Sequence, residues 1–159
     1  MSQPSEKKHA NPGRFAPRRD PRLSLSRKTF ELDSIGGDDE RFELDFMEGL
    51  VQQDPCNEDA LMLLGHAYTR LGDYEKGLDI DRRLVRLRPS DSTAFYNLAC
   101  SCALTGKREE AFSAMEHAVM LGYDDAEYMT TDPDLASVRN DPRFPKLLNR
   151  IKRRTAARS

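Results

Sequence analysis

The 159-residue sequence has no tryptophan, only three cysteines and no apolar run approaching the length of a membrane span. A transmembrane helix needs about 20 predominantly apolar residues, so we expect no membrane partner. An odd number of cysteines without an apolar signal segment favours free thiols and a cytoplasmic location. The Arg- and Ser-containing start leaves a mitochondrial presequence open as an alternative, although four prolines disfavour the amphipathic helix that it needs.

The sequence also lacks the residue patterns on which most catalytic and metal sites depend. It contains no H-E-x-x-H and no C-x-x-C motif. Its Gly36-Gly37 pair is followed by three acidic residues, which would repel a phosphate group. Cys100 and Cys102 would point about 200° apart on a helix and could not share a metal ion, so Cys102 is expected in the core. We therefore expect no enzymatic activity, no cofactor and no metal.

Charge is abundant but unevenly distributed. Residues 1–30 carry eight basic and two acidic residues, and residues 146–159 carry six basic residues and no acidic ones. The remaining residues, 31–145, hold 11 basic and 25 acidic residues, so a net charge of −2 conceals an acidic body with two basic ends. Because the first segment is rich in proline and has no apolar period, we expect residues 1–30 to form a disordered basic arm and residues 155–159 a basic tail.

One pattern of apolar and small residues occurs twice, 34 residues apart. "LGHAYTRLGDYEKGL" (64–78) aligns with "LACSCALTGKREEAF" (98–112), and "LDFMEGLVQQDP" (44–55) aligns with "LDIDRRLVRLRP" (78–89) as a further half copy. Within each copy the apolar residues recur at helical spacing. The expected helices span about 39–54, 58–71, 74–87, 92–104, 108–121, 125–131, 134–139 and 142–154.

The residues that end and begin these helices fit the same pattern. Gly72 and Gly106 stand where a first helix must end and the chain must reverse, which suits a residue without a Cβ. Asn57, Asp73 and Asp91 precede the next helices and are expected to cap them. The repeat is therefore a helix–turn–helix unit.

The first full copy contains a spaced set of large, small and turn-forming residues: Leu61, Leu64, Gly65, Tyr68, Gly72, Tyr74, Leu87 and Pro89. In this set the chain resembles the tetratricopeptide-repeat family, whose unit has 34 residues. The resemblance implies an all-α fold, a short right-handed α-solenoid of antiparallel helix pairs. It would form one domain, 39–154, with a half repeat (41–57), two repeats (58–91 and 92–125) and a cap (126–154). The segment "TTDPDLASVRNDPRF" is similar to the closing segment of many bacterial members.

In this family the first helices of the repeats line a concave groove that accepts peptides. The corresponding stripe here consists of Met62, His66, Thr69 and Arg70 in the first repeat and Thr93, Tyr96, Asn97 and Cys100 in the second. The resemblance thus implies a protein-interaction adaptor with a peptide or protein partner. The alternative is that so short a groove is filled by the cap helices or by the basic arm. The cationic cluster with which some members grip a carboxylate terminus is absent, since only Asn97 matches it.

Two further hypotheses rest on the basic ends. The arm residues Arg14, Arg18, Arg19, Arg22, Arg27 and Lys28, with the basic C-terminus, could contact nucleic-acid phosphates, and binding would then weaken steeply with salt. The alternative to nucleic-acid binding is that the ends only solubilise the chain or pair with its own acidic body. The second hypothesis is that basic ends and acidic bodies pair between copies and form a homo-oligomer. The oligomeric state therefore stays open at this point.

One charged residue interrupts the apolar pattern of the second helices. Asp81 stands where the other copies have Met47 and Met115. Either the helix is rotated so that Asp81 reaches solvent, or the carboxylate is buried and bonded to a neighbouring helix, because an unpaired buried charge is not tolerated.

Overall fold

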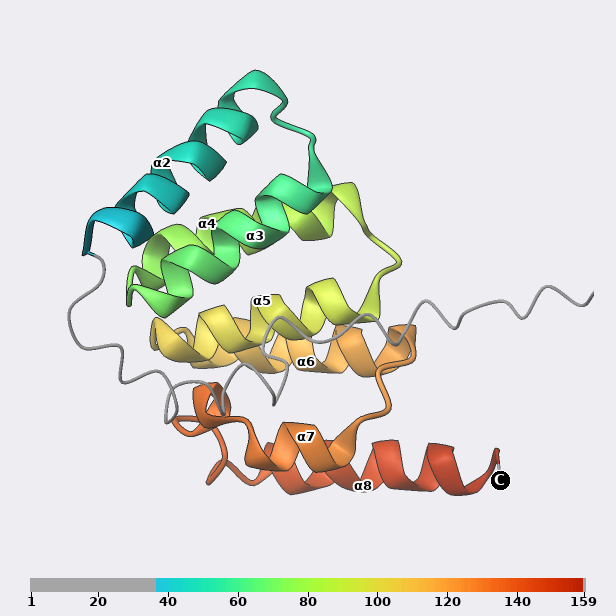
Figure 1. The fold of residues 1–159 in the computed structure, drawn as a ribbon. Coiled ribbons are helices and arrows are strands. Elements are labelled where there is room, and N and C mark those ends of the chain that lie inside the picture. Colours follow the sequence, from blue (N-terminus) through green and yellow to red (C-terminus); the bar gives the residue numbers. More distant parts are fainter. Residues whose placement is uncertain (1–36, 159) are drawn as a thin grey trace, which may run out of the picture.

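The computed structural model describes residues 37–158, which contain seven α-helices, one 3-10 turn and no strand. The elements are α2 (Gly37–Gln53), α3 (Glu58–Arg70), α4 (Tyr74–Leu87), α5 (Ser92–Leu104), α6 (Arg108–Leu121), α7 (Ala126–Thr131), η2 (Pro133–Leu135) and α8 (Arg143–Ala156). They stack in sequence order, from α2 at one end of the molecule to α8 at the other (Figure 1). The predicted all-α fold, a short solenoid of antiparallel helix pairs, is confirmed.

The helix boundaries follow from the capping residues. The Asn57 side chain accepts a hydrogen bond from the backbone N–H of Ala60 at 2.9 Å, and the Asp91 side chain accepts one from Thr93 at 2.8 Å. Gly72 and Gly106 adopt φ of +81° and +75°, a left-handed conformation that side chains disfavour. Each pair therefore reverses direction over three residues, at the positions that the repeat predicted.

The apolar core runs through the stack in two clusters. The smaller cluster joins α2, α3 and α4 through Val51, Leu61, Leu64, Tyr68, Ile80 and Leu84. The larger one begins at Leu78 on α4 and continues through α5 and α6 to the cap, where it includes Met129, Phe144 and Ile151. Because both clusters draw side chains from successive pairs, no pair buries its apolar face alone, as expected of a solenoid.

The C-terminal cap differs from the expectation in one element. Instead of a helix over 134–139, the chain forms the short turn η2 and then irregular turns up to α8. Two side chains hold this segment against its neighbours: Ser137 Oγ donates to the Ala103 carbonyl at 3.0 Å, and Arg139 Nη2 donates to the Asp132 carbonyl at 2.6 Å. These tertiary contacts outweigh the helical pattern of the local sequence.

Asp81 is completely buried between α4 and α5. Ser101 Oγ on α5 donates a hydrogen bond to Asp81 Oδ2 at 2.5 Å. Of the two interpretations, burial with a bond to a neighbouring helix is confirmed, and exposure through rotation of α4 is wrong. The hydrogen-bond donor also differs between the repeats, because Ser101 occupies the position that Ala67 has in the preceding repeat.

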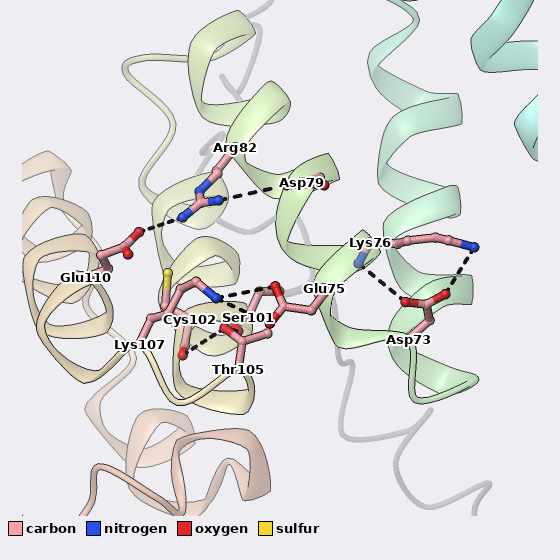
Figure 2. Close-up of polar contacts among 10 residues, drawn as sticks. All are labelled: Asp73, Glu75, Lys76, Asp79, Arg82, Ser101, Cys102, Thr105, Lys107 and Glu110. Atoms are coloured by element: carbon pink, nitrogen blue, oxygen red, sulfur yellow. Dashed lines mark hydrogen bonds and ion pairs between the residues drawn. The ribbon is translucent and has the colours of Figure 1, made fainter.

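Ion pairs bridge the second helices of successive units. Arg82 on α4 contacts Glu110 on α6 at 2.8 Å, and Lys107 contacts Glu75 at 3.3 Å (Figure 2). Further along, Arg143 on α8 contacts Glu109 on α6 at 2.7 Å. Solvent screens exposed pairs of this kind, so they orient neighbouring units more than they stabilise them.

Candidate protein-interaction surface

The predicted stripe divides into two halves with different environments. On α3, Arg70 is exposed and Met62 and His66 are half-buried. Thr69 is buried, and its hydroxyl donates to the Gly65 carbonyl at 3.0 Å within the helix. Three of the four predicted α3 residues can therefore be reached from solvent.

The α5 half of the stripe is closed. Thr93, Tyr96, Asn97 and Cys100 are all buried, with Tyr96 only 1% exposed. Tyr96 Oη donates to Asp132 Oδ2 at 2.8 Å, and the Cys100 thiol lies 3.6 Å from the same oxygen. The expectation that Tyr96 and Cys100 lie on an open groove is therefore wrong, and the alternative in which the cap fills the groove describes this half.

Aromatic packing completes the closure of α5. The Tyr96 ring stacks on that of Tyr123 with centroids 4.3 Å apart and planes at 5°, and Tyr128 of α7 lies against it at 6.0 Å. Burial raises the pKa of Tyr96 and of Tyr123 far above the ordinary value for tyrosine. Tyr96 thus stays protonated at physiological pH and remains a hydrogen-bond donor to Asp132.

The open surface on α3 contains one residue that sequence reasoning missed. Leu63 is 49% exposed, although it lies between predicted residues in the chain. Asp59, Leu63, His66 and Arg70 recur at helical spacing, and with Met62 they form what we call the α3 strip. A signal was present: Leu63 precedes Asn97, a predicted stripe residue, by the 34-residue period.

The α3 strip is joined to α2 by polar contacts. Arg70 Nη2 contacts Glu43 Oε2 at 2.8 Å, and Tyr68 Oη donates to Glu48 Oε1 at 2.5 Å. Burial, followed by the bonded Glu48 carboxylate, raises the pKa of Tyr68 well above its usual range. The α3 strip therefore combines apolar side chains with a cation already neighboured by a carboxylate.

The second charged surface lies on α8. This helix carries six basic residues and no acidic residue. Lys146, Asn149, Arg150 and Arg153 line a shallow depression on its outer face. The predicted basic arm, Arg14 to Lys28, lies outside the residues that the structure describes.

Two features of the described part of the chain concern chemistry: the arrangement of potential metal ligands and the state of the Cys102 thiol. Between residues 37 and 158, no three His, Cys, Asp or Glu side chains gather where they could hold a metal ion. Burial raises the pKa of the Cys102 thiol to about 11, so it is not a nucleophile at neutral pH. Cys102 lies in the larger core cluster, as predicted.

None of the described helices combines the length and the apolar composition that crossing a bilayer requires.

Thiol labelling tests this arrangement. Cys56 is exposed, whereas Cys100 and Cys102 are buried. We expect the native protein to react rapidly with one equivalent of Ellman's reagent and the guanidinium-unfolded protein with three. In Cys56→Ser the rapid phase should vanish. A second rapid equivalent in the native wild type, or any in that variant, would contradict the closed α5 surface.

Comparison with known proteins agrees with the helix pairs. A family model described as tetratricopeptide repeat matches residues 58–91 and 92–121, the pairs α3–α4 and α5–α6. The chain is 30% identical over 90 residues to a chloroplastic protein of Arabidopsis thaliana, covering 55% of this chain and 27% of that protein. It is 40% identical over 67 residues to a TPR repeat-containing protein of Picosynechococcus, covering 41% and 17%.

A third relative shows how local the similarity is. The "CTR9 homolog" of Arabidopsis thaliana is 41% identical over 51 residues, which is 32% of this chain and 5% of that protein. The chain thus spans about a quarter or less of the length of these curated relatives. Residues 58–121 match the tetratricopeptide-repeat model as two successive units, and the Picosynechococcus relative is named for the same repeat.

Proposed function

We propose that this chain is a non-enzymatic adaptor that binds a peptide or protein surface on the α3 strip. Repeats of this family generally mediate protein–protein interaction. The observation that carries the proposal is the contrast between the two halves of the stripe: the cap covers α5, whereas Met62, Leu63, His66 and Arg70 remain accessible. Among the described residues of the predicted stripe and its neighbour Leu63, these are the side chains that a partner can still reach.

The proposed ligand of the α3 strip is a short extended peptide segment. Asp59 and Arg70 lie 11 residues apart on α3, a distance of about 16 Å along the helix axis. An extended segment of about five residues has that length. Met62 and Leu63 would contact an apolar side chain of this segment. Arg70, already paired with Glu43, would offer its remaining N–H groups to a hydrogen-bond acceptor at one end.

Affinity capture with matched variants tests the proposal. Leu63→Asp places a charge in the middle of the strip, and its 49% exposure means that the fold tolerates the change. Met120→Asp is the control, because Met120 is 60% exposed on α6 and outside the strip. The wild type and Met120→Asp should capture the same proteins from the source cell extract. The captured amount of these proteins should be at least tenfold lower with Leu63→Asp. Equal capture by both variants would overturn the proposal.

A second candidate function is nucleic-acid association, which the basic outer face of α8 favours. Lys146, Arg150 and Arg153 on this face, together with the predicted basic arm, would contact phosphates. A gel shift at 50 and 200 mM salt, with Arg150→Glu/Arg153→Glu as the variant, tests it. Binding should fall steeply with salt and with the variant. No shift at the lower salt concentration would end this candidate.

We also propose a cytoplasmic location. The three cysteines of the chain are all free thiols, which suits a reducing compartment. Fractionation of the source cells tests the location.

Light scattering across a salt series determines whether acidic and basic surfaces of separate copies pair.

A further inference from the structure

The helix at one end of the stack leaves an aromatic face uncovered. Phe42 and Phe46 lie one helical turn apart on α2 and are 74% and 59% exposed. The opposite side of α2 packs on the smaller core cluster through Val51, with Leu44 and Met47 against it. Exposed apolar side chains that adjoin one another commonly mark a contact surface. Within residues 37–158, nothing covers the Phe42–Phe46 face.

Each of the two rings has a carboxylate close to it on the same helix. Glu43 precedes Phe46 by three residues and Asp45 follows Phe42 by three, a spacing that places side chains next to each other on a helix surface. Glu43 is 49% exposed although it pairs with Arg70, and Asp45 is exposed. A ring beside a carboxylate suits a guanidinium group, which stacks on aromatic faces and pairs with carboxylates.

The structure contains one such arrangement with its cation in place. On α6, Glu109 precedes Phe112 by three residues, which is the spacing of Glu43 and Phe46. The guanidinium of Arg143 on α8 lies 4.0 Å from the centre of the Phe112 ring and contacts Glu109 Oε2 at 2.7 Å. Helix α8 therefore already binds one helix of this chain through the kind of side-chain pair that α2 exposes.

Further cations of α8 lie on its outer face, at the other end of the stack. Lys146, Arg150 and Arg153 are exposed there, and none of them pairs with a carboxylate among residues 37–158. They follow one another at about 6 and 4.5 Å along the helix axis, and the two rings of α2 are about 6 Å apart along theirs. One face of α8 could therefore place two cations against the two rings.

Charge favours a second copy of this chain as the occupant. Helix α2 has six acidic residues and one basic residue, whereas α8 has six basic residues and no acidic one. Two copies of α2 would repel each other. The two helices lie at opposite ends of the stack, so α8 does not reach α2 within one molecule (Figure 1). An α8 helix that meets α2 therefore belongs to another copy.

We propose that the Phe42–Phe46 face of α2 in one copy docks on the basic outer face of α8 in a second copy, so that the molecules join end to end. Arg150 and Arg153 lie on the two rings and pair with the neighbouring carboxylates, as Arg143 does within the molecule. Because the contact joins two different surfaces, an open assembly keeps one free face at each end and can add further copies. The contact does not depend on the proposed function.

Analytical ultracentrifugation of the full-length protein, treated with nuclease, tests the docking. At 50 mM salt the mass of the wild type should rise with concentration beyond that of a dimer, and at 500 mM salt it should return to that of a monomer. A wild type that stays monomeric up to about 1 mM protein at the lower salt concentration would overturn the proposal.

Two variants identify the surfaces. Phe42→Ala/Phe46→Ala removes the rings and keeps α8 intact, whereas Arg150→Glu/Arg153→Glu reverses the cations and keeps α2 intact. Each variant alone should associate at least tenfold more weakly than the wild type. Mixed in equal amounts, they should form a heterodimer, because the intact α8 of the first variant meets the intact α2 of the second. A mixture that associates no better than its components would overturn the proposal.

A matched variant controls for the change in net charge. Arg86 on α4 and Arg108 on α6 are exposed, so Arg86→Glu/Arg108→Glu alters the charge by the same amount away from both faces. It should associate like the wild type, and an equal weakening in this variant would overturn the proposal. Undiminished association of Arg150→Glu/Arg153→Glu alone would also overturn it, because α2 would then meet a surface other than α8.

Discussion

Replacing Asp132 with alanine is expected to lower the free energy of unfolding by about 3 kcal/mol. The carboxylate is 1% exposed and accepts hydrogen bonds from Tyr96 Oη at 2.8 Å and from the backbone N–H of Asp134 at 3.0 Å. Leaving a buried hydroxyl without its acceptor costs about 1–3 kcal/mol, and losing a cap costs about 1 kcal/mol more. Urea unfolding of the purified protein, followed by circular dichroism, measures the change.

Two variants separate the lost hydrogen bonds from a general disturbance of the cap. Asp132→Asn keeps a carbonyl oxygen for the Tyr96 hydroxyl and should lose less than half as much stability. Tyr96→Phe removes the donor, so Asp132→Ala should cost less in that background. In Asp132→Ala the cap should loosen over α5, so Cys100 should also begin to react with Ellman's reagent. If Asp132→Ala unfolds like the wild type, the closure of α5 does not depend on this bond.

The second large effect has the opposite sign. Replacing both Asp81 and Ser101 with the residues found at their equivalent positions, as Asp81→Met/Ser101→Ala, is expected to stabilise the protein by about 1–4 kcal/mol. Asp81 is completely buried, and the desolvation of a buried carboxylate commonly exceeds what its contacts return. Met47 and Met115, with Ala67, show that the repeat accommodates the apolar pair.

The single variants should both be destabilised. Asp81→Ala removes the acceptor of the buried Ser101 hydroxyl, and Ser101→Ala removes a donor from a buried carboxylate, so each should lose about 1–3 kcal/mol. Urea unfolding of the four proteins gives the coupling between the two positions. A double variant less stable than either single variant would show that the apolar pair overpacks the contact between α4 and α5.

The helix pairs could be predicted because their determinants are local. Gly72 and Gly106 are needed for left-handed turns, and Asn57 and Asp91 cap the helices that follow them. These residues act within a few positions of where they stand, so one sequence is enough to recognise them. The repetition at 34 residues then relates one pair to the next.

The accessible surface could not be predicted in the same way. Tyr96 and Cys100 occupy the same register as Met62 and His66, yet they are closed by Asp132, which is 36 residues from Tyr96 in the chain. The repeat register assigns a residue to a face of its helix. It does not show which later segment packs on that face.

The charges of the two end helices have a consequence for how the molecule moves in solution. Six acidic residues and one basic residue lie on α2, six basic residues and no acidic one lie on α8, and the helices are at opposite ends of the stack (Figure 1). The described unit therefore has a large permanent electric dipole along its length. Near a charged macromolecule it would rotate into alignment before the two surfaces touch, and added salt would weaken that torque.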